Sequence, residues 1–367
     1  MKRAVCFTLV MVMLTSFVIA GCAQPTTTPA PAPSPKPAAT PTPAPASPPT
    51  PATPAKQYSQ IRYVAAPTGS DNYTLGAIFA DYAGKALGMP AGVLPGGSVE
   101  NIKAIDKGNA EIGYCSVPDA YNGFNGLTPF DRKYDKIRFL DRYSTVSLTF
   151  AVRMDSDIKT IPDLLKGKKV GIGTGGSAAE LITLAVLEAG YGIKPEGIEK
   201  GGGVVSHISY AAMGTGLADK TLDCVCLFAY QSAVAKNHLA AEERFGLRLL
   251  PVEDAAMTKI LAKYPFYAKG QMDGGLYKGN PSAVPCVNLS FIQVTSKDLP
   301  DDLVYKIMNV LWNEDLAKKA IASCPALPDY QLRWTLREGY NVIPVHPGAA
   351  KWYKDKGMTL PAGAKVG

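Results

Sequence analysis

Three turns rich in glycine and serine could bind a small anion. The clearest lies in residues 169–180 (Lys-Val-Gly-Ile-Gly-Thr-Gly-Gly-Ser-Ala-Ala-Glu), where a predicted strand over 168–172 leads into a helix beginning at Ser177. The first N–H groups of a helix lack partners within it and carry partial positive charge, so glycines and a hydroxyl there favour a phosphate or carboxylate. Similar turns occur at 68–72 and 95–101. Three such turns in one chain predict one shared binding site.

The spacing of Gly171, Gly173 and Gly176 also matches the Gly-x-Gly-x-x-Gly fingerprint of dinucleotide-binding domains. Such a domain should carry an acidic residue at the end of the next strand, about 20 residues on. The acids in that region, Glu196 and Glu199, lie instead in a glycine-rich stretch predicted to be a loop. The pattern therefore favours a carboxylate-binding turn, with a nucleotide site and a purely structural turn as the alternatives.

Hydroxyl groups near these turns are the other candidate ligand contacts. Ser98 and Ser116 could bind a ligand, or could only cap a helix and end a strand. Tyr73, Tyr121 and Tyr230 could place a phenol against a ligand, or could pack in the core.

Motifs of hydrolytic and phosphoryl-transfer enzymes are absent from the sequence. It contains no G-x-S-x-G, no H-E-x-x-H and no Walker lysine motif, and its only histidines are His207, His238 and His346. We therefore expect a non-enzymatic protein with no catalytic residue, no metal and no cofactor. His346, in the turn 344–348, is expected to make a structural hydrogen bond.

The amino-terminal segment carries an export signal. A short basic start precedes an apolar run over residues 4–20, as in a secretory signal, and residues 19–22 (Ile-Ala-Gly-Cys) resemble a bacterial lipobox. Cleavage before Cys22 and lipidation of that cysteine are predicted, with an uncleaved membrane anchor as the alternative. Residues 23–56 are mostly Pro, Ala, Thr and Ser and should form an extended tether. The folded body should be extracytoplasmic, either as a membrane lipoprotein or in the periplasm.

Charge and cysteine usage restrict the partners further. The formal net charge of +7 falls by two, to +5, without Lys2 and Arg3, and the other basic residues are interleaved with acids, which argues against nucleic acid. Cys6 belongs to the signal and Cys22 would carry lipid. The remaining cysteines are predicted to be buried and unpaired, with one disulfide as the alternative. They are Cys115, Cys224, Cys226, Cys286 and Cys324.

Alternating strand and helix patterns over residues 57–367 predict two α/β lobes. Strand-turn-helix units between 61 and 107, followed by a strand over 111–116, predict a parallel sheet with its ligand turns at the carboxyl ends of the strands. Long strand-like segments at 143–152 and 283–295 predict two crossovers that form a hinge. The predicted divisions are the signal peptide 1–21, the lipidated linker 22–56, lobe 1 over 57–147, lobe 2 over 148–288, and a return to lobe 1 with carboxyl-terminal helices over 289–367.

Two local predictions depend on composition and periodicity alone. Residues 122–126 (Asn-Gly-Phe-Asn-Gly) are predicted to form a polar loop. The helix over 177–189 should place one apolar side on the core. That side consists of Leu181, Leu184, Ala185 and Leu187.

Together these motifs resemble the TAXI family, the extracytoplasmic solute receptors of TRAP transporters. The likeness extends over residues 61–357. Its most specific motifs are 95–101 (Pro-Gly-Gly-Ser-Val-Glu-Asn), 173–180, 263–267 (Lys-Tyr-Pro-Phe-Tyr), 299–305 (Leu-Pro-Asp-Asp-Leu-Val-Tyr), 346–349 (His-Pro-Gly-Ala) and 352–357.

The resemblance implies a two-lobe periplasmic-binding-protein fold of type II with two crossover hinge strands. A monomer of this kind would close on a small carboxylate, a glutamate-like amino acid or a dicarboxylate, and deliver it to the membrane permease subunits of a TRAP transporter. The contacts that the resemblance implies are Thr68, Gly69, Ser70, Tyr73, Gly97, Ser98, Ser116, Thr174, Gly176, Ser177 and Ala178.

One position departs from the family pattern. Asp71 and Asn72 stand where the family commonly has glycines, and a carboxylate there could repel a diacid or pair with an amino group of the solute. Two other functions remain open: a solute-binding protein of an ABC importer, and a nucleotide-binding enzyme or sensor.

Overall fold

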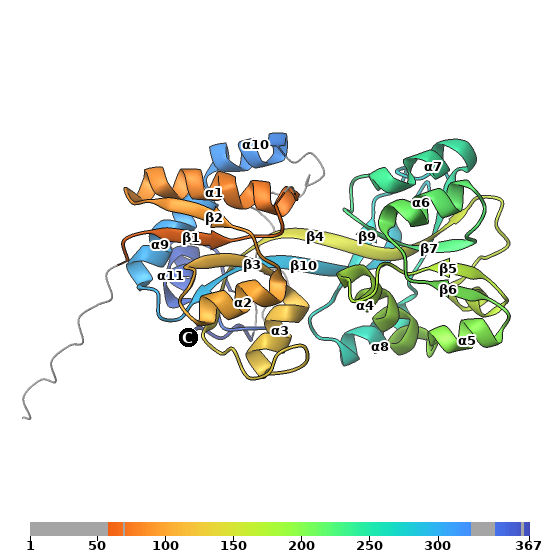
Figure 1. Cartoon of the computed structure of the whole chain (residues 1–367), viewed down its shortest axis with the longest axis horizontal. Coiled ribbons are helices and arrows are strands. Elements are labelled where there is room, and N and C mark those ends of the chain that lie inside the picture. The colour runs from red at the N-terminus through yellow and green to blue at the C-terminus, as the bar shows by residue number, and fades with distance from the viewer. Residues whose placement is uncertain (1–57, 69, 324–341, 361–362) are drawn as a thin grey trace, which may run out of the picture. The chain divides into compact units, whose positions relative to one another are not determined.

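The computed structural model describes residues 58–68, 70–323, 342–360 and 363–367. The predicted signal, Cys22, the linker, Gly69 and Cys324 lie outside these residues. Two separate clusters of buried apolar side chains form the cores of two lobes, and two long strands run side by side between them (Figure 1). The predicted two-lobe α/β fold with two crossover strands is confirmed.

Three short parallel strands form the sheet of the first lobe, because each is apolar and is followed by a helix that covers the sheet. The strands are β1 (Ile61–Val64), β2 (Ala91–Leu94) and β3 (Ile112–Ser116). The helices of this lobe are α1 (Asp71–Leu87), α2 (Ser98–Asp106), α3 (Val117–Asn125), α9 (Asp301–Leu311), α10 (Glu314–Ser323) and α11 (Pro347–Asp355).

The two crossover strands are β4 (Ile137–Arg153) and β10 (Val284–Ser296), which pair antiparallel over most of their length. They join both lobes into one sheet of ten strands, in the order β2-β1-β3-β10-β4-β7-β5-β6, with β8 on β4 and β9 on β10. The register shifts twice, between Phe291 and Ile292 and between Gln293 and Val294.

The second lobe repeats the strand-turn-helix plan. Its strands are β5 (Lys169–Gly171), β6 (Val204–Ser206), β7 (Cys224–Ala229), β8 (Leu247–Leu250) and β9 (Ala268–Met272). Its helices are α4 (Ala178–Ala185), α5 (Pro195–Lys200), α6 (Tyr210–Ala218), α7 (Leu239–Phe245) and α8 (Asp254–Lys263). It also contains a π-helix, η2 (Val186–Gly190), and short 3₁₀ turns, η1 (Ile161–Leu165) and η3 (Lys236–His238).

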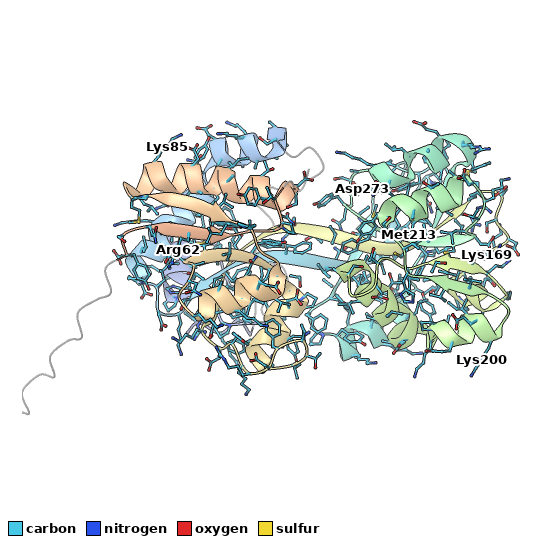
Figure 2. All side chains as sticks on the ribbon, in the orientation of Figure 1. Arg62, Lys85, Lys169, Lys200, Met213 and Asp273 are labelled. Carbon is cyan, nitrogen blue, oxygen red and sulfur yellow. The ribbon has the colours of Figure 1, made fainter. Side chains whose placement is uncertain are left out.

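The parallel strands of both lobes end toward the middle of the crossover strands. Ser116, at the end of β3, pairs with Phe291 of β10, and Ala229, at the end of β7, pairs with Ser147 of β4. Ser147 in turn pairs with Asn288, so the two strand ends are three residues, roughly 10 Å, apart along β10. Lys169, the first residue of β5, accordingly lies at the outer edge of the second lobe (Figure 2). The carboxyl ends of the parallel strands in the two lobes therefore face each other.

Two local predictions were wrong. Residues 122–126 were predicted to form a loop, but most of them belong to α3, because Ser116 caps its start and Gly126, with a left-handed backbone (φ 71°), ends it. Leu181 was predicted to face the core, but it is 55% exposed. The buried face of α4 contains Ala179, Ile182 and Thr183 instead.

The structure also bears on the cysteines and on membrane crossing. Cys115, Cys224, Cys226 and Cys286 are buried free thiols, and burial raises the pKa of Cys226 and of Cys286 to about 12, so both stay protonated. Among the described residues, no helix is both long and apolar enough to cross a membrane.

Candidate functional site

The turn after β1 places a helix start at the inner edge of the first lobe. The hydroxyl of Ser70 accepts a hydrogen bond from the N–H of Tyr73 at 3.2 Å and donates one to the carbonyl of Pro67 at 2.8 Å. Thr68 is exposed beside it, and Tyr73 is half-buried against the first core. The predicted turn therefore exists, with its serine acting as the N-cap of α1.

The next two helix starts of this lobe are bonded to each other. The Oγ of Ser98, the first residue of α2, accepts a hydrogen bond from the N–H of Ser116 at 2.7 Å. Ser116 caps α3 by accepting from the N–H of Asp119, and its hydroxyl donates to the Asp119 carboxylate at 2.6 Å. Gly97, the N-cap of α2, has no side chain to satisfy the first N–H groups of that helix.

Asn101 holds the ends of two strands at this edge. Its amide Nδ2 donates to the carbonyls of Ala65 and Tyr114, both at 2.9 Å, and the side chain is buried. Its Oδ1 lies beneath Gly96, where a Cβ would come within 2.1 Å of that oxygen. The Pro-Gly-Gly-Ser-Val-Glu-Asn motif thus has a structural basis, because glycine is needed for the close approach and asparagine for the two bonds.

In the second lobe the turn after β5 already holds a carboxylate. Gly173 and Gly176 have left-handed backbones, with φ of 94° and 76°, and Ser177 caps α4 by accepting from the N–H of Glu180 at 3.2 Å. One oxygen of Glu180 accepts from the N–H of Gly176, and the other is bonded to Nδ1 of His207. Of the other predicted contacts here, Thr174 is exposed and Ala178 begins the helix.

Sequence reasoning missed the next helix start of this lobe. His207 follows the last residue of β6, and Ser209 caps α6 by accepting from the N–H of Ala212 at 3.3 Å. Gly171 of β5 pairs with Ser206 of β6, so the two turns lie side by side. The pattern Ser-x-x-Glu at 177–180, a capping box, could have indicated that Glu180 folds back on its own turn.

Aromatic rings connect the two lobes beside these turns. Tyr121 of α3 contacts Phe266 of the second lobe, with ring centroids 5.4 Å apart. Phe266, Tyr230 and Phe291 each pack against both cores. Tyr230, predicted as a ligand contact, is therefore half-buried at the junction of the lobes.

Polar side chains line the crossover strands where the strand ends converge. Arg142 is only 7% exposed and donates to the hydroxyl of Thr145, which is 2.8 Å from the hydroxyl of Ser290. Further along the same pair of strands, the hydroxyl of Ser147 donates to Oδ1 of Asn288 at 2.7 Å. None of these residues was predicted as part of the site, because their spacing within a strand resembles that of ordinary buried polar positions.

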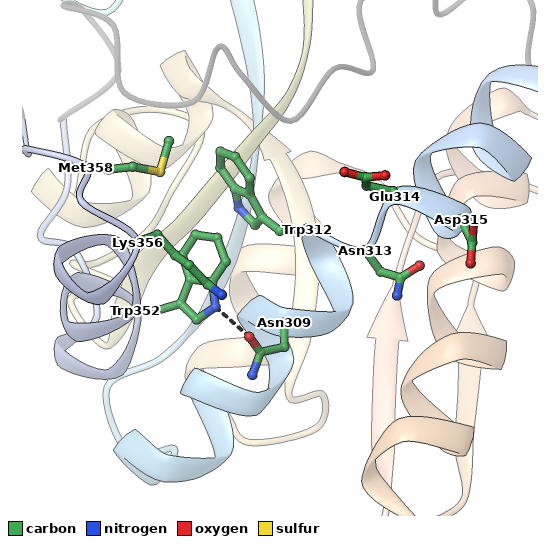
Figure 3. Close-up of a pocket in the computed structure, with 8 residues that line it drawn as sticks. All are labelled: Asn309, Trp312, Asn313, Glu314, Asp315, Trp352, Lys356 and Met358. Atoms are coloured by element: carbon green, nitrogen blue, oxygen red, sulfur yellow. Dashed lines mark hydrogen bonds between the residues drawn. The ribbon is translucent and has the colours of Figure 1, made fainter.

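The structure brings the predicted contacts together as two groups, one at the inner edge of each lobe. Gly69 cannot be placed because it lies outside the described residues. No cluster of potential metal ligands occurs in the part of the chain that the structure describes. A hollow of about 530 Å³ lies elsewhere, between α9, the start of α10 and α11, and contains none of the predicted contacts (Figure 3).

Comparisons with known proteins gave one family match and several distant structural matches. A model of the NMT1-like family matches residues 64–357. Among solved structures, XAC2383 from Xanthomonas citri bound to ATP has 10% identity, 81% and 95% coverage of this chain and of that chain, and a TM-score of 0.48. A TctC solute binding protein from Polaromonas has 17% identity, 72% and 88% coverage and a TM-score of 0.45. The aliphatic sulphonate binding protein SsuA from Escherichia coli has 12% identity, 75% and 83% coverage and a TM-score of 0.40. Likenesses of this size identify no ligand.

Proposed function

The chain belongs to the NMT1-like family, and on that premise we propose that it is an extracytoplasmic solute receptor. It captures a small carboxylate between its two lobes and delivers it to the membrane permease subunits of a TRAP transporter of the TAXI type. It is a monomeric binding protein without catalytic function, anchored by lipid on Cys22 and tethered through residues 23–56. The division of the chain into lobes at residues 57–147, 148–288 and 289–367 is part of the same proposal.

One observation carries this proposal: the carboxyl ends of the parallel strands in both lobes face each other across the middle of β4 and β10. Each of these ends leads into a turn with glycine, serine or both, followed by a helix. Helix starts supply backbone N–H donors, and serines supply hydroxyls, as uncharged partners for a carboxylate. Uncharged donors bind a carboxylate while avoiding the desolvation cost of a buried ion pair each time the site opens.

Opening and closing would depend on the two crossover strands. They are the elements with substantial pairing in both lobes, and the aromatic contact between Tyr121 and Phe266 lies beside the strand ends. A solute that contacts both lobes would favour the closed arrangement, so that binding and closure form one equilibrium.

Thermal stability of the body, residues 57–367, tests the proposal. The protein should first be unfolded and refolded to remove any ligand carried through purification, and then heated with amino acids, dicarboxylates, keto acids and nucleotides. A ligand at 100 times its dissociation constant adds about 2.7 kcal/mol to the free energy of unfolding. A shift with carboxylates supports the receptor function, whereas a shift with nucleotides alone would overturn it.

A further inference from the structure

The start of α4 is occupied by a carboxylate of the chain itself. Glu180 is 7% exposed, and its two oxygens are bonded to the N–H of Gly176 and to the imidazole of His207. A solute carboxylate approaching this turn would compete with Glu180 for the N–H of Gly176. It would also meet a like charge in a partly desolvated place, where repulsion is stronger than in water.

The imidazole of His207, which is bonded to Glu180, is partly exposed to solvent. His207 is 48% exposed at its side chain and lies at the inner edge of the second lobe, beside the turn after β5. Where the carboxylate of Glu180 accepts this bond, Nδ1 of His207 is the donor, which assigns the ring its Nδ1–H tautomer. In the tautomer with its proton on Nδ1, Nε2 is an acceptor, because the bond at one ring nitrogen sets the role of the other.

The first lobe differs in this respect. Gly97 leaves the start of α2 without a side-chain cap, and the carboxylate of the exposed Glu100 lies over it, with Oε2 2.8 Å from where a Cβ of Gly97 would be. The two lobes therefore differ in how firmly the carboxylate at the helix start is held: Glu100 is exposed and can be displaced by a solute, whereas Glu180 is buried and bonded through both oxygens.

We propose that the Glu180–His207 pair determines the class of solute: the second lobe receives a hydrogen-bond donor, an ammonium or hydroxyl group, at Nε2 of His207, and Glu180 excludes a second carboxylate. The single carboxylate of the solute binds to the first lobe. The solute is then an amino or hydroxy acid with one carboxylate rather than a dicarboxylate. This inference rests on the proposed function and refines it, with Glu180 as a positioning residue that acts through His207.

Matched pairs of amino acids test the inference on the full chain purified in detergent. Glutamine and glutamate, and asparagine and aspartate, differ only in the second carboxylate, and succinate lacks the ammonium group. We expect at least tenfold tighter binding of the amide member of a pair, by calorimetry. Glu180→Gln should abolish this preference, and His207→Gln should weaken binding of the amide about tenfold. Glu199→Gln, an exposed substitution in α5 at the opposite edge of the sheet, is the matched control and should change neither.

A second readout separates this role from a merely structural one. Nitrogen NMR of the imidazole should show His207 protonated at Nδ1 in the parent chain and a changed tautomer in Glu180→Gln, since glutamine can donate to Nδ1. Equal affinity for both members of each pair, or binding of succinate alone, would overturn the inference and leave the receptor function standing. No binding of any carboxylate would instead remove the proposed function.

Discussion

The hydroxyl oxygen of Ser98 accepts a hydrogen bond from the backbone N–H of Ser116 at 2.7 Å. These residues begin α2 and end β3, so one side chain fixes the distance between two helix starts at the inner edge of the first lobe. The hydroxyl of Ser116 is engaged as well, by Asp119. Ser116 therefore acts mainly by positioning backbone groups, whereas the bond made by Ser98 leaves its hydroxyl proton to be donated to a ligand.

Replacing Ser98 by alanine should accordingly weaken solute binding and lower stability together. Ser98→Ala leaves the N–H of Ser116 without its partner, at a cost of about 1 kcal/mol in the free energy of unfolding and roughly tenfold in affinity. Thr160→Ala removes a capping residue of η1, before the outer end of β5, and serves as the control. Urea titration and calorimetry on both variants would show the difference, and an unchanged affinity in Ser98→Ala would contradict this role.

Glycine at position 96 is required by the amide of Asn101. A Cβ added to Gly96 would lie 2.1 Å from Oδ1 of Asn101 and 3.1 Å from the carbonyl oxygen of Ala65. Gly96→Ala should therefore displace Asn101 from the strand ends and reduce stability by roughly 1–3 kcal/mol, as overpacking does. Gly92→Ala is the matched control, because nothing lies within 4 Å of its Cβ. Equal melting temperatures for the two variants would contradict the close approach.

The architecture could be predicted from the sequence because the strand-turn-helix units repeat locally. The crossover strands were located, but the predicted start of β4, at residue 143, was six residues late. Arg138, Asp141 and Arg142 interrupt the apolar run, and their burial depends on partners far along the chain or across the sheet. Such partners cannot be identified from the local sequence pattern.

The same limit applies to the candidate site. The turns themselves were predicted, but the capping residue at 95–101 was not: Ser98 was offered as a helix cap, whereas the structure has Gly97 as the N-cap of α2. Ser70, Ser116 and Ser177 are N-caps instead. The contact between Glu180 and His207 was not predicted, because it joins residues 27 apart through the pairing of β5 and β6. Contacts between residues far apart in the sequence, rather than residue type, determine which groups of each turn remain available to a ligand.

Acid should destabilise the second lobe through His238. This side chain is 1% exposed, its ring nitrogens make no hydrogen bond to the described residues, and burial lowers its pKa to about 4. The unfolded chain takes up the proton near pH 6.5, so the stabilising contribution is complete above that pH and is lost as the pH falls to about 4. Between pH 7.5 and pH 5 this proton uptake lowers the free energy of unfolding by about 2 kcal/mol. His238→Leu should remove that loss in urea titrations. Parallel losses in the two proteins would contradict this assignment.

Asp141 should show the opposite pH dependence. Burial raises the pKa of this carboxyl well above its usual range, and its Oδ1 has no hydrogen bond within the part of the chain described here. The folded protein therefore keeps a proton that the unfolded chain releases near pH 4, so stability declines as the pH rises from about 4 toward the folded pKa. Asp141→Asn removes the ionisable group, and the new amide can donate to Gln293, the partner across the strands.

Asp141→Asn should raise the free energy of unfolding by about 1–3 kcal/mol at pH 7, and this gain should shrink toward pH 4. Asp135→Asn changes an exposed aspartate nearby and should leave the melting temperature within about one degree at either pH. A lower melting temperature for Asp141→Asn at pH 7 would mean that the carboxylate is ionised and compensated in the fold.

Closure of the lobes should depend on the ring of Phe266. It contacts Tyr121 across the junction and also packs on Tyr267, at a centroid distance of 4.9 Å. Phe266→Ala removes the contact between lobes, worth about 0.5–1.5 kcal/mol beyond area burial, and should speed solute release roughly tenfold with little change in the association rate. Phe245→Ala, in α7 of the second lobe, is the control for loss of an aromatic ring outside the junction. Stopped-flow release rates distinguish the two variants. If release is equally fast in parent and Phe266→Ala, the aromatic contact does not hold the lobes closed.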